Sequence, residues 1–156
     1  RDLHSFPTRR SSDLLAGTVV DRAGQRTEVA PARYYVFYRS SSTCPNSVNY
    51  TPRFSERMSR ILERHPHVRL LSLSNDATPA AMLEFARQHR MPGHFVASTD
   101  LHPAFFRYQA QVMPALVVVD PLGREIMAQR RYTGPASLDL VLDRLEAELA
   151  KVSATP

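Results

Sequence analysis

The most informative scarcity in this 156-residue sequence is cysteine, which occurs once, as Cys44. A chain with a single cysteine cannot form an internal disulfide, so its compartment cannot be inferred from disulfide bridges. Any redox chemistry must therefore use this thiol alone or together with another molecule.

Long apolar runs and lysine clusters are missing as well. No apolar stretch approaches the ~20 residues that a membrane-spanning helix needs, which excludes a transmembrane segment. The formal charge of +5 comes almost wholly from arginine, because Lys151 is the only lysine, and the arginines are scattered along the chain. Scattered positive charge is typical of a solvated surface, so we expect no nucleic-acid partner.

The length suits one domain with one packed core. Residues 1–14 differ from the rest, because they show no periodicity, carry paired arginines and serines, and resemble translated adaptor sequence more than a signal peptide. We therefore expect a non-native or disordered leader over residues 1–14 and a single domain over residues 15–153. Localisation stays open between periplasmic or secreted and cytoplasmic.

The first half of the domain reads as strand and helix patterns in alternation. Residues 17–29 alternate around a turn at Asp21–Gly24, which predicts a short N-terminal hairpin. The aromatic and β-branched run Tyr34–Tyr38 predicts a strand buried on both faces. A helix is predicted from Pro45 to about Arg64, with proline in the first turn. Its expected inward face holds Val48, Phe54, Met58, Ile61 and Leu62.

The second half continues the alternation and ends in a hairpin and a helix. The order βαβα predicts a right-handed crossover and a parallel strand pair, and the turn at 120–123 predicts an antiparallel hairpin. The expected fold class is therefore α/β, a central mixed sheet flanked by helices. The predicted elements are a strand at Val68–Ser74, a helix at Thr78–His89, a short helix at 100–110, strands at Ala115–Asp120 and 124–132, and a helix from about Ser137 to Leu149 with Ser137 as its N-cap.

Cys44 stands directly before a predicted helix, in a run of small polar residues. Unpaired backbone N–H groups and the positive end of the helix dipole stabilise a thiolate over a thiol at such a position. Because free cysteine is also among the most buried residue types, the alternative is an inert core thiol. The polar neighbours favour an exposed, nucleophilic Cys44.

The ordered set of motifs resembles the thioredoxin-like superfamily. A strand is followed by Cys44-Pro45-Asn46-Ser47 at a helix start, by Pro52, and later by Met113-Pro114 before a strand and hairpin. This is similar to the C-P-P-C…T-P pattern of the nucleoredoxin, tryparedoxin and TlpA-type branches. The resemblance implies a thioredoxin-like fold in which a cis Pro114 lies beside the thiol. It also implies that the Met113 backbone pairs with an extended substrate segment.

The departures from that pattern change the expected chemistry. Ser47 stands where dithiol members have their second cysteine, so a mixed disulfide on Cys44 cannot be resolved within the motif. Ser47 is either an ordinary residue of the first helical turn or a residue whose hydroxyl donates a hydrogen bond to the Cys44 thiolate. Thr43 replaces a tryptophan that is common before the motif, and Tyr38 stands where many thioredoxins keep a buried acid. Monothiol glutaredoxins use C-x-x-S with glutathione, but their other glutathione-binding residues are not recognisable here.

We therefore predict thiol–disulfide exchange through one nucleophilic cysteine, with an external thiol resolving the adduct. The alternative is a redox-inactive thioredoxin-fold module that binds peptides or proteins. The expected partner is a protein or a low-molecular-weight thiol or disulfide, and the oligomeric state is left open. We expect no cofactor and no metal, because His65 and His67 lack a third ligand. Candidate catalytic residues are Cys44 and Ser47, and candidate substrate-binding residues are Thr43, Pro45, Asn46, Met113 and Pro114.

Overall fold

The computed structural model describes residues 15–100 and 112–153. Over these residues the chain forms one five-stranded sheet in the order β3-β2-β1-β4-β5. The elements are β1 (Tyr34–Ser40), α2 (Pro45–Arg64), β2 (Val68–Ser74), α3 (Pro79–Gln88), β3 (His94–Val96), the 3₁₀ helix η1 (Ser98–Asp100), β4 (Ala115–Val119), β5 (Glu125–Gln129) and α4 (Pro135–Ser153).

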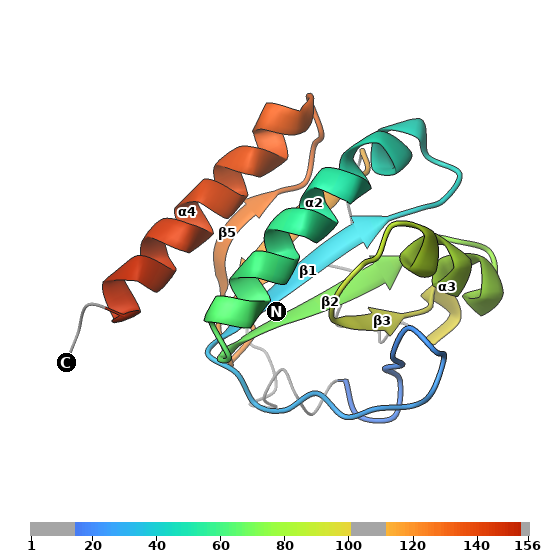
Figure 1. Ribbon diagram of the computed structural model, residues 1–156, viewed down its shortest axis with the longest axis horizontal. Helices are drawn as coiled ribbons and strands as arrows, with labels where there is room; N and C mark the ends of the chain where they lie inside the picture. The colour runs from blue at the N-terminus through green and yellow to red at the C-terminus, as the bar shows by residue number, and fades with distance from the viewer. Residues whose placement is uncertain (1–14, 101–111, 154–156) are drawn as a thin grey trace, which may run out of the picture.

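The sheet is mixed, as the sequence predicted. β1 pairs in parallel with β2, and β2 in parallel with β3. On its other side β1 pairs antiparallel with β4, which pairs antiparallel with β5. Helices α2 and α4 lie side by side across the sheet (Figure 1), and Arg57 of α2 bonds Asp143 and Glu146 of α4. This arrangement confirms the α/β class with helices flanking a central sheet.

The central strand β1 is buried on both faces, which confirms the interpretation of its aromatic run. On one face Tyr38 packs with Phe54 of α2 in the larger of two apolar clusters. On the other face Tyr35 and Phe37 pack with Leu15 and the neighbouring strands. Because successive strand residues point to opposite faces, one unbroken apolar strand can serve two cores.

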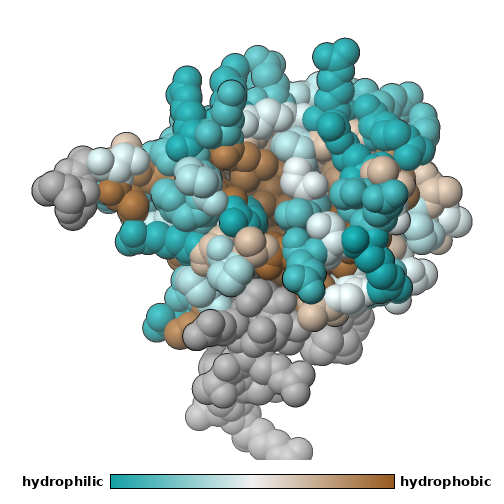
Figure 2. Space-filling view, turned by 60° about the horizontal axis from the view of Figure 1, so that its bottom comes forward, coloured by the Kyte–Doolittle hydropathy of each residue, from teal (hydrophilic) through white to brown (hydrophobic). Residues whose placement is uncertain are grey.

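Charged side chains are spread over the surface. In Figure 2 hydrophilic side chains project from most of the visible face, and the apolar surface lies recessed between them. Many of these side chains form exposed ion pairs, such as Arg60 with Glu56 and Arg124 with Asp120. In the described part of the chain no helix combines the length and the apolar character that crossing a membrane requires.

The N-terminal turn is present, but its arms form isolated bridges instead of two strands. The Asp21 carboxylate accepts hydrogen bonds from the backbone N–H groups of Ala23 and Gln25, at 2.8 and 3.0 Å. Val20 bridges Arg26 across the turn and also Phe95 of β3. The chain therefore divides its backbone pairing between its own turn and the edge of the main sheet.

The start of the last helix differs from the prediction, and most of the predicted short helix before β4 lies outside the described residues. Ser137 is not the N-cap of the last helix, because α4 already begins at Pro135, a residue whose fixed φ and missing N–H suit a first helical turn. The Ser137 hydroxyl instead donates to the Gly134 carbonyl oxygen at 2.6 Å. Of the short helix predicted over 100–110, Asp100 ends η1 and the remainder lies outside the described residues.

We predict that His94 makes the fold less stable at acidic pH. Burial, and secondarily the charge of Arg69, lower the pKa of this histidine, and its buried Nδ1 has no hydrogen-bond partner within the described residues. Because the folded-state pKa lies below the unfolded value of about 6.5, the stabilisation is complete above that pH and is lost as the pH falls below it.

Urea unfolding at a series of pH values tests this prediction. His94→Gln should lose less unfolding free energy than the wild type between neutral and mildly acidic pH. Some dependence should remain, because burial also lowers the pKa of His89. An equal change of unfolding free energy with pH in the wild type and the variant would contradict the prediction.

Candidate functional site

Cys44 is the N-cap residue of α2, with extended backbone angles of φ −93° and ψ 116°. Its carbonyl oxygen accepts the first helical hydrogen bond from Val48 N–H at 3.0 Å, and its own N–H donates to Ser41 O at 3.2 Å. The side chain is half-buried. The thiol therefore lies at the end of the helix where backbone N–H groups are left without helical partners.

The residues Met113-Pro114, which are remote in sequence, meet the thiol. The Cys44 Sγ donates to the Met113 carbonyl oxygen at 3.8 Å, a contact between residues 69 positions apart. The Met113–Pro114 peptide bond is cis, and β4 begins at the next residue, Ala115. Because Ala115 pairs with Arg39 at the end of β1, the sheet itself brings the two segments together.

Ser47 is fully buried in the first turn of α2. Its Oγ accepts a hydrogen bond from Ser41 N–H at 3.3 Å, and its carbonyl oxygen accepts one from Thr51 Oγ1 at 2.6 Å. Within the described residues, no hydrogen bond joins the Ser47 hydroxyl to Cys44. Of the two roles that the sequence left open for Ser47, this geometry corresponds to a first-turn helix residue that supports the preceding loop.

The other candidate residues differ in exposure. Thr43, Pro45 and Asn46, the sequence neighbours of Cys44, are exposed, whereas Pro114 is buried. Val48 was expected to face the core, yet it is 38% exposed. It lies one turn after Cys44 on the solvent side of α2, because the buried face of the helix runs through Ser47, Tyr50 and Phe54. Val112, which precedes Met113, is 36% exposed.

Tyr38 replaces a buried acid with a buried phenol. Its ring stacks on Phe54 with centroids 3.8 Å apart, and its Oη lies 2.9 Å from Thr51 Oγ1. Burial raises the pKa of Tyr38 well above its ordinary value. The phenol therefore stays protonated at neutral pH and cannot take up a proton as a carboxylate would.

Sequence reasoning missed Asp76, which lies two residues after β2. The side chain is 5% exposed, and its carboxylate accepts hydrogen bonds from Ser41 and Ser42 in the loop before Cys44. The only local signal was an Asn-Asp pair after a strand, which is common in turns. Ser41 and Ser42 lie more than 30 residues before Asp76, so no local pattern shows that they are its partners.

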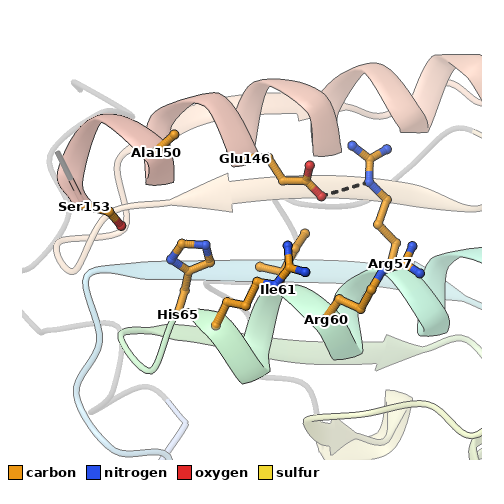
Figure 3. A pocket seen from close by; sticks show the side chains of 8 residues that line it. Arg57, Arg60, Ile61, His65, Glu146, Ala150 and Ser153 are labelled. Carbon is orange, nitrogen blue, oxygen red and sulfur yellow. Dashed lines mark hydrogen bonds and ion pairs between the residues drawn. The ribbon is translucent and has the colours of Figure 1, made fainter.

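A separate groove of about 720 Å³ runs between α2 and α4 (Figure 3). It lies at the far end of α2 from Cys44, where α2 and α4 both end. Its arginines complement the negative C-terminal ends of the two helices, and Arg57 and Arg60 are already paired with carboxylates. In the described residues no three His, Cys, Asp or Glu side chains gather to hold a metal ion. We assign no chemistry to this groove.

No sequence model of a protein family matches the chain, and no curated protein matches it. Solved structures do. Thioredoxin from Wuchereria bancrofti matches with a TM-score of 0.66 at 16% identity, covering 84% of this chain and 97% of that one. A secreted disulfide oxidoreductase from Mycobacterium tuberculosis matches with a TM-score of 0.64 at 19% identity, covering 88% of this chain and 99% of that one.

A third similar structure is the Xanthomonas campestris bacterioferritin comigratory protein, studied for alkyl peroxide reduction. It has a TM-score of 0.65 at 15% identity and covers 84% of this chain and 89% of that one. Likeness at such low identity concerns the arrangement of the backbone. The chain therefore has a thioredoxin-like fold, which confirms the resemblance inferred from its motifs.

Proposed function

We propose that this protein catalyses thiol–disulfide exchange with Cys44 as its only nucleophilic sulfur. The observation that carries the proposal is the position of the half-buried thiol, at the N-terminus of α2 and 3.8 Å from the Met113 carbonyl oxygen. The helix end favours the thiolate, and the Met113 backbone offers a partner for an extended substrate segment. Similar folds that are named as a thioredoxin and a disulfide oxidoreductase support the proposal.

The reaction takes place in two exchange steps. The Cys44 thiolate attacks one sulfur of a disulfide R–S–S–R′, so the S–S bond breaks, a Cys44–S–S–R bond forms, and R′–S⁻ leaves with the electron pair and takes a proton from water. An external thiolate R″–S⁻ then attacks the R sulfur of the mixed disulfide, so an R–S–S–R″ bond forms and Cys44 leaves as a thiolate. A second external thiol releases R–SH from R–S–S–R″ by the same exchange, so the substrate disulfide is reduced and two external thiols are oxidised to one disulfide.

Stoichiometric and catalytic reactions with a chromogenic aromatic disulfide test the proposal. The reduced protein alone should release a single equivalent of aromatic thiolate and carry the adduct on Cys44, as measured by absorbance and mass spectrometry. Added glutathione should restore the thiol and allow repeated cycles. Cys44→Ser should remove both reactions.

An ordinary thiol on the same helix provides the matched control. Ser59 is exposed in the middle of α2, so the double variant Cys44→Ser/Ser59→Cys has one cysteine away from the helix end. Cys44 should react several-fold faster than this control, because only Cys44 lies at the helix N-terminus. Equal rates, or failure of glutathione to release the adduct, would count against the proposal.

The second candidate function is a redox-inactive binding module. The exposure of Val48 and Val112, one turn after Cys44 and directly before Met113, favours it, because these apolar side chains are open to contact with a bound peptide. This function predicts that Cys44→Ser retains its affinity for the partner, whereas Val48→Asp loses it. Exchange chemistry predicts instead that the wild type forms a mixed disulfide with its partner through Cys44.

A further inference from the structure

The loop between β1 and α2 is tied to a single carboxylate, that of Asp76. Oδ1 of Asp76 accepts from Ser42 N–H at 2.8 Å, from Ser42 Oγ at 2.6 Å and from Ser41 Oγ at 3.2 Å. Oδ2 accepts from Ser74 Oγ at 2.9 Å. A carboxylate offers about four acceptor sites, so these donors satisfy it.

The place of Asp76 in the fold explains why it can reach this loop. β2 is the parallel neighbour of β1, so the segments that follow the two strands emerge at the same edge of the sheet. Asp76 is further held by its own backbone, because its N–H donates to Ser74 Oγ at 2.9 Å and its carbonyl oxygen accepts from Ser98 Oγ at 3.0 Å. Asp76 is therefore held in place beside the sheet, and its carboxylate in turn holds the loop.

Ser41 links Asp76 to the thiol. Its hydroxyl donates to Asp76, its carbonyl oxygen accepts from Cys44 N–H at 3.2 Å, and its N–H donates to Ser47 Oγ at 3.3 Å. Both ends of the first turn of α2 thus depend on where Ser41 lies. The loop Ser41–Thr43 belongs to no helix or strand, and it is a turn closed by the hydrogen bond from Cys44 N–H to Ser41 O.

We infer that Asp76 is a positioning residue for Cys44, which acts through its hydrogen bonds to the loop and holds the thiol at the N-terminus of α2. This inference rests on the proposed function only for the reaction that the positioned thiol carries out. In the described residues no arginine or lysine forms an ion pair with Asp76. Its carboxylate instead accepts hydrogen bonds from the loop residues Ser41 and Ser42 and from Ser74.

Whether loss of Asp76 slows or speeds the alkylation of Cys44 separates this positioning role from a purely electrostatic one. Removing a nearby negative charge should stabilise the Cys44 thiolate and speed its alkylation at neutral pH. Releasing the loop should do the opposite, because the sulfur leaves the helix end that favours its charged form. The phenols of Tyr38 and Tyr132, whose pKa values burial raises, also interact with Cys44 and stay neutral in this assay.

The test compares Asp76→Ala with Asp76→Asn by the iodoacetamide alkylation rate of the full chain. Asp76→Ala should slow alkylation at neutral pH by roughly ten-fold, because less of the thiol is ionised once the sulfur leaves the helix N-terminus. At alkaline pH, where any cysteine is ionised, its rate should match the wild type. Asp76→Asn keeps an acceptor oxygen for the loop and should react at least as fast as the wild type.

Asp120→Ala is the matched control. Asp120 organises the β4–β5 turn through the N–H groups of Leu122 and Arg124, at the opposite end of the sheet. It should lower the melting temperature and leave the alkylation rate unchanged. Should Asp76→Ala fail to fold, Ser41→Ala removes the linking hydroxyl alone and should slow alkylation at neutral pH in the same direction.

Three results would overturn the inference. They are faster alkylation in both Asp76 variants, slower alkylation in both, and an Asp76→Ala rate equal to that of the wild type at neutral pH. Alkylation reports on the thiol whether or not exchange occurs. Failed exchange in the wild type together with the expected alkylation pattern would therefore remove the proposed function and leave the role of Asp76 in place.

Discussion

Ser47→Cys is expected to form an intramolecular disulfide with Cys44. The variant should release its own mixed disulfide, which the wild type can release only through an external thiol, and it should turn over when a reductant restores the dithiol. Cys44 is the N-cap of α2, and position 47 lies three residues later in its first turn. Residues three apart are neighbours on a helix, within the range that a disulfide can bridge. The second sulfur can then attack a mixed disulfide on Cys44, which Ser47 cannot do.

The structure also predicts limits on this variant. The Ser47 hydroxyl accepts from Ser41 N–H, and sulfur is a weaker acceptor, so some stability should be lost. Turnover should be slow, because Tyr38 is a buried protonated phenol and cannot accept the proton of the new thiol. The test is therefore whether the bridge forms and whether the reduced variant alone fully reduces one substrate disulfide per chain, and several when a thiol reductant is added.

Thiol counting after mild oxidation, with mass spectrometry of the linked peptides, measures the bridge. Asn46→Cys is the matched control, because residues two apart do not face each other on a helix, and it should keep two thiols that do not bridge within the chain. Two free thiols in oxidised Ser47→Cys would show that the first turn of α2 does not present position 47 to Cys44.

Gly93→Ala should strongly destabilise the fold. Gly93 precedes β3 with φ +84°, and a Cβ there would lie 2.6 Å from the backbone oxygen of Leu70 in β2. A left-handed backbone costs a non-glycine residue about 1–2 kcal/mol. The backbone clash adds an overpacking cost of about 1–3 kcal/mol, because a carbonyl oxygen in a paired strand cannot rotate away.

Gly17→Ala isolates the backbone contribution. Gly17 has φ +78°, and a Cβ there would meet nothing within 4 Å. Its free energy of unfolding should fall by about 1–2 kcal/mol only, from the left-handed conformation. Urea unfolding of the two variants should give a clearly larger loss for Gly93→Ala, and equal losses would refute the close approach of β2 to this glycine.

Much of the fold could be predicted because its signals are local. The run Val68–Ser74 matches β2 to the residue, and the apolar spacing with an initial proline predicted both ends of α2. β3 was missed because it has three residues, too few to show a periodicity. The arms of the N-terminal turn were read as strands because alternation does not reveal that Val20 pairs with distant Phe95.

By itself, the sequence determined the alternating α/β order, the single thiol and its place at a helix start, because each depends on neighbouring residues. Only the tertiary structure decided what the site is made of. The family resemblance had implied Met113 beside the sulfur, and the structure supplies that contact across 69 positions. The hydrogen bond from Ser41 to Ser47, the exposure of Val48 and the bonds from the loop to Asp76 were not foreseen. These contacts follow from strand order in the sheet, which sets side by side segments that no local pattern relates.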